Sequence, residues 1–274
     1  MKLKRLLLKF ERIYEKYGVL VERGYFLKYT LIYKFYLRLL KCFKFSPIVP
    51  KNVIWRNTTL KTKIELEQAI DIIKKSKLNI KTNVIEKNWD SLIALSTILQ
   101  NTDRNAVILD AGGQLDSLIL HWLFQFGYKN LSCLNLTFKK RIKRGNIEFL
   151  SGDLTMTNFP NNYFDIITCI SVIEHGVDKE KYFEEMHRIL KKGGLLITST
   201  DYWETKLETS NKYIYNNPVY IFDKNSIQNL LEKAKSKGFQ LFGPEVDLSC
   251  REKVVHWRRF NLKFTFLIFC LQKD

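Results

Sequence analysis

A short run of apolar residues, Val107 to Leu109, leads directly into Asp110 and then into the pair Gly112 and Gly113. The run has no alternation of polar and apolar side chains, which is typical of a strand buried on both faces of a parallel sheet. The glycines permit a tight turn whose backbone N–H groups can face a ligand, and an amphipathic helix over 118–126 follows. A strand, a glycine turn and a helix N-terminus together favour a crevice for a nucleotide-like ligand.

Four more apolar segments are expected to be strands, and each leads into residues that can do chemistry. The carboxyl ends of parallel strands meet at one edge of a sheet, so these residues are expected to lie near the glycine turn. The first of them stands roughly 20 residues after the turn, where dinucleotide-binding folds place a ribose-binding acid. The segments and their residues are 131–135 with Asn135, 147–153 with Asp153, 163–171 with Ser171 and then His175, and 193–198 followed by Asp201.

This ordered set resembles the class I S-adenosylmethionine-dependent methyltransferases, especially the small-molecule branch whose fourth strand ends in a Glu-His pair, here Glu174-His175. The resemblance covers about residues 85 to 271. It implies an α/β, doubly wound, Rossmann-like fold with a seven-stranded, mostly parallel sheet whose last strand is antiparallel. It also implies S-adenosylmethionine as the cofactor, and it suggests no metal ligands.

The resemblance assigns cofactor-binding roles to individual residues. It implies that Asp110 fixes the turn, that Asn135 faces the ribose, and that Asp153 accepts a hydrogen bond from the adenine amino group. The backbone N–H of Leu154 is expected to contact the adenine as well. The full set of expected cofactor-binding residues is Asp110, Gly112, Gly113, Gln114, Asn135, Asp153, Leu154 and Ser171.

The chain departs from the family pattern at three of these positions. Gln114 and Asp116 replace the second and third glycines of D-x-G-x-G-x-G, and Asn135 replaces the usual acid. A carboxylate accepts hydroxyl hydrogen bonds with charge assistance and a neutral amide does not, so we expect cofactor binding weaker by about 1–2 kcal/mol. The departures leave open a non-catalytic protein that keeps the fold with a degenerate cofactor site.

Methyl transfer needs an aligned nucleophile and, for a hydroxyl acceptor, a group that removes a proton. His175 and Asp201 are the candidate catalytic bases, with a hydrogen bond that fixes the loop as the alternative role of His175. Tyr202, Trp203 and His256 are candidates for binding the acceptor, since aromatic and polar side chains suit a sugar. Residues 204–222 are expected to form a lid.

The overall charge is the unusual feature of the composition. The 274 residues include 45 Lys and Arg against 28 Asp and Glu, which gives a net charge of +17. Such a balance favours anionic partners without choosing among them. The five cysteines form no CxxC pair, which indicates a reducing cytoplasm.

Residues 1–60 are expected to form a basic, helical extension, and residues 61–274 the methyltransferase domain. Lys34, Arg38 and Lys41, which we call the basic stripe, share one face of an expected helix. Each basic residue costs about 2.5–3.5 kcal/mol at a bilayer centre, which argues against a spanning helix. The stripe suits an anionic membrane surface, on the cytoplasmic side, or else solvated lysines on a helix packed against the domain.

Two kinds of acceptor remain for the expected enzyme. The first is a small molecule or glycan methylated on oxygen. The second is RNA, suggested by the basic segments 139–144 and 258–259. The Ser-Val-Ile-Glu-His sequence that ends the fourth strand argues against RNA, because it lacks the Asn/Asp-Pro-Pro-aromatic signature of enzymes that methylate exocyclic amines.

Overall fold

The computed structural model describes residues 47–81, 84–214 and 217–274. A ten-stranded sheet forms its centre, and seven of the strands correspond to those expected from the sequence. These strands are β2 (Val107–Ala111), β3 (Asn130–Asn135), β5 (Ile147–Ser151), β6 (Phe164–Ile170), β7 (Leu190–Tyr202), β10 (Phe239–Leu241) and β12 (Leu262–Lys273).

The middle of the sheet is parallel, in the order β5, β3, β2, β6 and β7. β12 runs antiparallel beside β7 and also pairs antiparallel with β10. The predicted Rossmann-like α/β fold with an antiparallel last strand is therefore confirmed. The carboxyl ends of β2, β3, β5 and β6 share one edge, where the candidate residues were expected.

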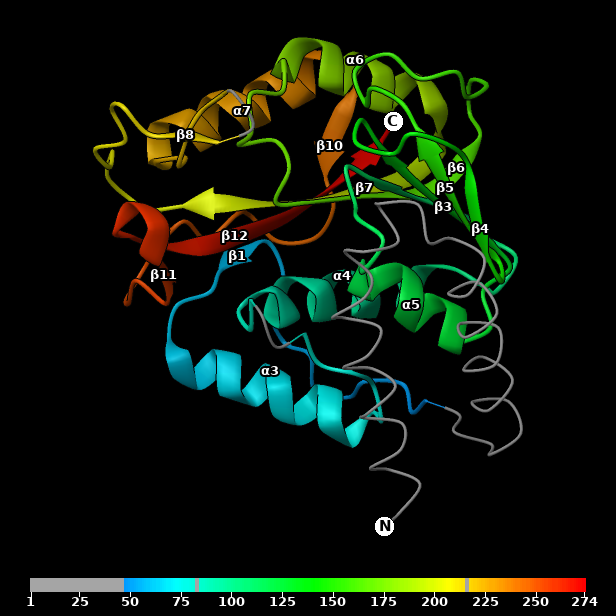
Figure 1. Ribbon diagram of the computed structural model, residues 1–274, viewed down its shortest axis with the longest axis horizontal. Helices are drawn as coiled ribbons and strands as arrows, with labels where there is room; N and C mark the ends of the chain where they lie inside the picture. Colours follow the sequence, from blue (N-terminus) through cyan, green and yellow to red (C-terminus); the bar gives the residue numbers. More distant parts are fainter. Residues whose placement is uncertain (1–46, 82–83, 215–216) are drawn as a thin grey trace.

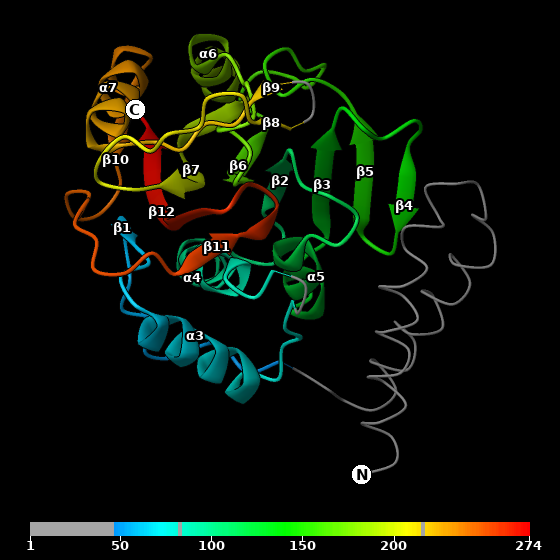
Figure 2. The same cartoon turned by 60° about the vertical axis from the view of Figure 1, so that its left-hand side comes forward.

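Three short strands extend this sheet. β4 (Ile142–Arg144) is added beside β5, as Figure 2 shows, while β1 (Thr58–Thr59) and β11 (Val255–Trp257) pair with β12. A separate hairpin of β8 (Tyr213–Ile214) and β9 (Asn217–Pro218) lies within the expected lid. Because β1 precedes residue 60, the last part of the expected extension belongs to the sheet.

Helices cover both faces of the sheet (Figure 1). On one face lie α3 (Lys63–Lys75), α4 (Lys87–Asn101) and α5 (Leu118–Gln125), and on the other lie α6 (Lys179–Ile189) and α7 (Lys224–Ser236). Two separate clusters of buried apolar residues correspond to these two faces. A 3₁₀ turn, η1 (Arg258–Phe260), precedes β12.

The helices of the described residues include none that is long and apolar enough to cross a membrane. The basic stripe lies outside the described residues, so the expected membrane-facing helix is not tested.

Candidate functional site

The turn after β2 accepts only glycine at two positions. Gly112 has a φ of +84°, and a Cβ placed on it would lie 2.5 Å from Cγ1 of Val172. A Cβ on Gly113 would lie 2.0 Å from Oδ2 of Asp110. The N–H of Gly112 donates to the carbonyl of Leu134 at 2.7 Å. The turn is therefore packed against the end of β3 and the loop that follows β6.

Asp110 braces this turn from within the sheet, as the family resemblance implies. Its side chain is 3% exposed. Oδ2 accepts a hydrogen bond from the Ser117 hydroxyl at 2.6 Å, and Oδ1 accepts one from the Thr168 hydroxyl at 2.8 Å. Burial raises the pKa of Asp110, and the two hydroxyl hydrogen bonds oppose that rise. The carboxyl group thus joins β6 to the residue that precedes α5.

Asn135 ends β3 beside the turn, but its side-chain amide is already fully used. Nδ2 donates to the carbonyls of Gly112 and Gly113, both at 2.9 Å. Oδ1 accepts from the backbone N–H of Thr137 at 2.9 Å and from its hydroxyl at 2.8 Å. An amide has two donor hydrogens and two acceptor positions, so all four are occupied. A ribose hydroxyl would have to displace one of these bonds.

The two residues that replace family glycines do not fill the turn. Gln114 is exposed, and the carboxylate of Asp116 forms an ion pair with Lys81 at 2.9 Å. The carbonyl of Leu115 accepts a hydrogen bond at 3.2 Å from Arg144, a buried residue whose pKa is lowered to about 10 by burial. Sequence reasoning missed Lys81 entirely and counted Arg144 as part of a basic surface. Neither residue carries a local sequence signal, because each acts on a distant part of the chain.

Asp153 and Leu154 follow β5 at the same edge of the sheet. Asp153 is exposed, and its Oδ1 accepts hydrogen bonds from the N–H of Thr155 at 2.8 Å and from its hydroxyl at 2.7 Å. These bonds fix the backbone of a turn. Leu154 is buried. The second carboxylate oxygen of Asp153 remains available for a ligand donor.

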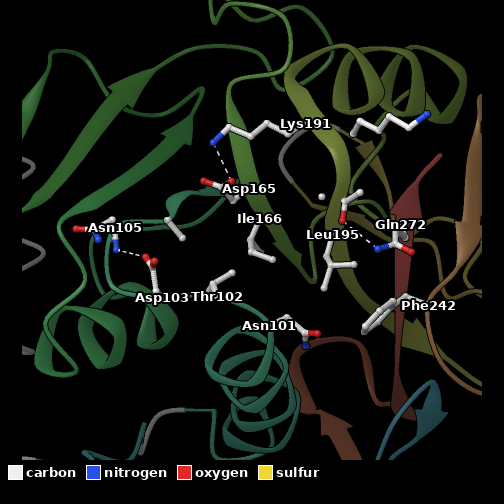
Figure 3. A pocket seen from close by; sticks show the side chains of 14 residues that line it. Asn101, Thr102, Asp103, Asn105, Asp165, Ile166, Lys191, Leu195, Phe242 and Gln272 are labelled. Atoms are coloured by element: carbon white, nitrogen blue, oxygen red, sulfur yellow. Dashed lines mark hydrogen bonds and ion pairs between the residues drawn. The ribbon is translucent and has the colours of Figure 1, made fainter.

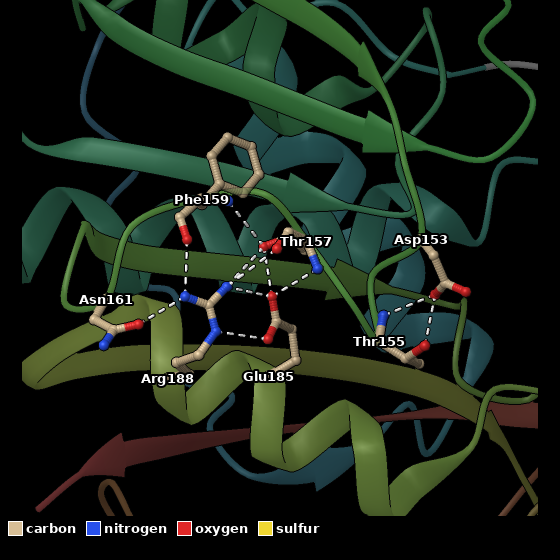
Figure 4. A network of polar contacts seen from close by, with 7 residues as sticks. All are labelled: Asp153, Thr155, Thr157, Phe159, Asn161, Glu185 and Arg188. Atoms are coloured by element: carbon tan, nitrogen blue, oxygen red, sulfur yellow. Dashed lines mark hydrogen bonds and ion pairs between the residues drawn. The ribbon is translucent and has the colours of Figure 1, made fainter.

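A half-buried ion pair on α6, between Glu185 and Arg188, contacts the rest of this loop (Figure 4). Glu185 accepts hydrogen bonds from the N–H and hydroxyl of Thr157 at 2.7 and 2.6 Å. Arg188 donates to Glu185 at 2.7 Å and to the carbonyl of Phe159 at 2.8 Å. The network holds the segment that carries Asp153 in a defined position.

Ser171 begins the loop after β6 in a left-handed conformation, with a φ of +51°. Its N–H donates to the carbonyl of Ser199 at 3.0 Å. Its hydroxyl is buried and has no hydrogen-bond partner in the described structure. A strained residue with an unpaired polar atom at this edge is consistent with the expected ligand-binding role.

Three carboxyl groups are buried together next to this loop, and we call Asp90, Glu174 and Asp201 the acid pocket. Asp90, in the first turn of α4, accepts a hydrogen bond from the Ser199 hydroxyl at 2.9 Å. Oε2 of Glu174 accepts one from the Thr200 hydroxyl at 3.1 Å. Sequence reasoning singled out Asp201 alone, because the three acids come from three distant segments.

The acid pocket changes what Asp201 can do. Burial, and then the charges of Glu174 and Asp90, raise the pKa of Asp201 well above its ordinary value. A carboxyl group with a raised pKa holds its proton and donates a hydrogen bond, and it is a poor acceptor of a proton. The protonated form of Asp201 is therefore suited to donate a hydrogen bond to Glu174.

His175 follows Glu174 of the acid pocket directly in the chain. Burial lowers its pKa, although the charge of Glu174 opposes the change. The imidazole is therefore neutral over a wider pH range and is suited to accept a proton. Next to it, a Cβ on Gly176 would lie 2.5 Å from the side chain of Asn217 on β9. The hairpin of the expected lid is thus packed against the loop that carries His175.

Each of the three expected acceptor-binding residues has contacts of its own in the structure. Tyr202 is fully buried and donates its hydroxyl to the carbonyl of Leu248 at 2.9 Å. The Nζ of Lys253 lies over the ring of Trp203, 4.8 Å from its centroid. His256 on β11 is exposed and lies 3.2 Å from Oδ1 of Asn261. β7 runs four residues beyond the expected strand, to Tyr202, which places that side chain in the core.

A cavity of about 520 Å³ opens at the opposite edge of the sheet (Figure 3). Asp165, at the start of β6, pairs there with Lys191 at 2.8 Å, and Gln272 donates to the carbonyl of Gly193 at 3.0 Å. The residues that line this cavity include none of the expected site residues. It is therefore separate from the glycine turn and the acid pocket.

Comparison with known sequences finds methyltransferases. Residues 118–198 match a family profile described as a methyltransferase domain. A ubiquinone/menaquinone biosynthesis C-methyltransferase UbiE from Francisella tularensis subsp. novicida is 43% identical over 53 residues, which are 19% of this chain and 21% of that protein. The enzyme of the same description from Psychromonas ingrahamii is 32% identical over 75 residues, 26% of this chain and 30% of that protein. The matched part is thus about a fifth to a third of these relatives.

Two solved structures share the fold over most of the chain. The [4+2]-cyclase SpnF matches with a TM-score of 0.52 and 12% identity, covering 77% of this chain and 94% of that one. A chain in the complex between the Haloferax volcanii Trm112 methyltransferase activator and a methyltransferase matches with a TM-score of 0.51 and 15% identity, covering 77% of this chain and 97% of that one. At these identities the likeness shows the fold alone, and the cyclase illustrates that the fold does not determine the reaction.

Proposed function

We propose that this chain, whose residues 118–198 match a methyltransferase domain, is a class I S-adenosylmethionine-dependent methyltransferase that transfers the methyl group to oxygen of a small-molecule or glycan acceptor. The observation that carries the proposal is the arrangement at the carboxyl edge of the sheet. A glycine turn packed on Val172 stands there beside the unpaired hydroxyl of Ser171 and the carboxyl groups of Glu174 and Asp201.

The residues present fit the methionine end and the adenine of the cofactor, whereas binding of the ribose requires a change in hydrogen bonding. The glycine turn and the unpaired Ser171 hydroxyl suit the polar methionine end, and the available oxygen of Asp153 suits an adenine amino group. At the ribose position, Asn135 would have to exchange an internal hydrogen bond for one to the ligand. Binding is therefore expected to be weak but specific.

The bound cofactor supplies an activated methyl group on a sulfonium. The chain's own residues then have three tasks. Asp110 holds the turn, the hairpin of β8 and β9 shields the loop that carries His175, and the neutral imidazole of His175 accepts the acceptor's proton. Asp201 keeps its proton and orients Glu174, so the general base is assigned to His175 alone.

Transfer to carbon is the second candidate, because the curated relatives are C-methyltransferases. A carbon acceptor also loses a proton, so His175 would have the same role. RNA is a weaker candidate in this structure. Arg144, which contributed to the basic segment that suggested RNA, is buried against Leu115 and lies over the ring of Phe149.

Calorimetry with S-adenosylhomocysteine tests the proposed function without a known acceptor. We expect binding in the wild type, and we expect Asp153→Ala to weaken it by about 1–3 kcal/mol through loss of a polar partner. Thr155→Val is the matched control, since it removes the hydroxyl bonded to Asp153 at 2.7 Å and keeps the carboxylate. If the wild type gives no heat of binding at millimolar ligand, the chain is a non-catalytic relative.

A further inference from the structure

The segment that leads into β12 concentrates positive charge. Residues 251–263, which we call the arginine hairpin, contain β11, η1 and the first residues of β12. Their only acidic residue is Glu252, and their five basic residues are Arg251, Lys253, Arg258, Arg259 and Lys263. All six of these residues are exposed. The arginine hairpin therefore presents a strong excess of positive charge to solvent.

The charges of the arginine hairpin are not neutralised within the described parts of the chain. No ion pair within 4 Å joins any of its five basic residues to an acid among the described residues. The carboxylate of Glu252 accepts the backbone N–H of Lys63 at 3.1 Å and so contacts the start of α3. By contrast, Lys233 and Lys237 near the end of α7 both pair with Glu180 of α6. The cations of the arginine hairpin are thus accessible to an external anion.

Aromatic packing supports the two arginines of η1. The rings of Trp257 and Phe260 meet edge to face with their centroids 4.7 Å apart, and the Trp257 ring also contacts that of Phe264. The guanidinium of Arg259 lies over the Phe260 ring, 5.0 Å from its centroid. A guanidinium stacked on a ring keeps the N–H donors of its edge for an anion such as a phosphate. The packing therefore orients Arg259 and supports the backbone that carries Arg258.

The arginine hairpin stands at the carboxyl edge of the sheet, beside the end of β7. β12 is antiparallel to β7, and its Thr265 pairs with Tyr202, the last residue of β7. The residues of β12 that pair with β11 precede Thr265, so the hairpin extends past this edge (Figure 1). Lys253 contacts the residue that follows β7, because its Nζ lies 4.8 Å from the centroid of the Trp203 ring. The loop that carries His175 follows β6, which is parallel to β7, so it leaves the sheet at the same edge.

We propose that the arginine hairpin binds a phosphate group carried by the methyl acceptor, with Arg258 and Arg259 as its direct contacts. This inference rests on the proposed function, because it names the chemical class of the acceptor in that reaction. One arginine balances a carboxylate, whereas a phosphate monoester carries a charge of about −1.5 to −2 and needs two cations. The phosphate group has two sources: a water-soluble acceptor, or the headgroup of a lipid acceptor.

Two probes distinguish these sources. Calorimetry with inorganic pyrophosphate measures binding of a water-soluble phosphate, and flotation with phosphatidylcholine vesicles, with and without phosphatidic acid, measures binding of a lipid phosphate. Flotation is measured in a full chain whose basic stripe is replaced by Glu, so that the stripe does not contribute. A water-soluble acceptor predicts binding of pyrophosphate alone, whereas a lipid acceptor also predicts flotation that requires phosphatidic acid.

The double variant Arg258→Gln with Arg259→Gln should weaken pyrophosphate binding about tenfold to a hundredfold, because it removes the charge-assisted hydrogen bonds of both arginines. The matched control is Lys74→Gln with Lys77→Gln, which removes the same charge from two exposed residues at the far end of α3 from Glu252. The control should keep the affinity of the wild type for pyrophosphate. Both double variants should bind S-adenosylhomocysteine as the wild type does, which shows that they fold.

Absence of binding of both probes to the wild type would overturn the phosphate site and leave the proposed function standing. An equal loss of pyrophosphate affinity in the control variant would also overturn it, because net charge alone would then explain the binding. Binding of a single-stranded RNA oligonucleotide that depends on Arg258 and Arg259, without binding of either probe, would replace the phosphorylated acceptor by RNA. If pyrophosphate binds but S-adenosylhomocysteine does not, the proposed function and the acceptor role fail, and the phosphate site remains.

Discussion

The substitution Asn135→Asp separates two accounts of the position that follows β3. The family pattern predicts that an acid there binds ribose and tightens cofactor binding. The geometry predicts the reverse, because the Asn135 amide donates to the carbonyls of Gly112 and Gly113 at 2.9 Å each. An aspartate cannot donate either bond, and its charge would face two carbonyl oxygens.

The size of the effect follows from these contacts. Two hydrogen bonds at about 0.5–1.5 kcal/mol each give a loss of about 1–3 kcal/mol in the free energy of unfolding. The turn that must hold the cofactor loses its brace, so S-adenosylhomocysteine should bind more weakly as well. Urea denaturation measures the first quantity and calorimetry the second.

Thr137→Val is the matched control for this substitution. It removes the hydroxyl that donates to Oδ1 of Asn135 at 2.8 Å and keeps both bonds to the turn. We expect a loss of under about 1.5 kcal/mol in stability and no change in ligand affinity. Tighter ligand binding by Asn135→Asp, with undiminished stability, would refute the assignment of Asn135 as a brace.

Two further predictions concern parts of the chain outside the turn. Arg188→Met should lower the free energy of unfolding by about 1–3 kcal/mol at pH 7. Hydrogen bonds from Arg188 and Thr157 lower the pKa of Glu185, although burial opposes the change, so this loss should shrink as the pH falls from 4.5 through that lowered pKa. An equal loss at pH 3 in urea denaturation would contradict this account. We also propose that the basic stripe binds anionic membranes. Flotation with vesicles should then require acidic lipid and weaken with salt, and substitution of the three stripe residues by Glu should abolish flotation without changing ligand affinity. A wild type that stays unbound to vesicles at low salt would exclude membrane binding by the stripe.

The sheet and its helices were predictable because their signals are local. Runs such as Val107–Leu109 are buried on both faces and read as strands, and the helices show apolar residues at helical spacing. The end of β7 was not predictable in this way. Its polar residues from Thr198 to Asp201 do not resemble a strand, yet all are buried because residues 266–269 of β12 pair with them, and Thr265 pairs with Tyr202. That pairing also explains why Tyr202 lies in the core.

The sequence predicted the role of a site residue only where that residue contacts the strand or turn that contains it. Gly112 and Asp110 were recognised because their roles follow from the strand and turn that contain them. The acid pocket was not, because Asp90, Glu174 and Asp201 are brought together by the sheet topology alone. Asp90 in particular lies in α4, which is far in sequence from the strand ends where candidate residues were sought, although it contacts Ser199 of β7.

The loss of family glycines is therefore a poor guide to whether the cofactor site works. Gln114 is exposed, and Asp116 is neutralised by Lys81, so neither side chain occupies the turn. The departure that matters is Asn135. Its side-chain amide donates to the carbonyls of the turn, and these hydrogen bonds compete directly with one to a ribose hydroxyl. A functional site needs that competition to favour the ligand, whereas a degenerate one keeps Asn135 on the turn. The affinity for S-adenosylhomocysteine measures this balance directly.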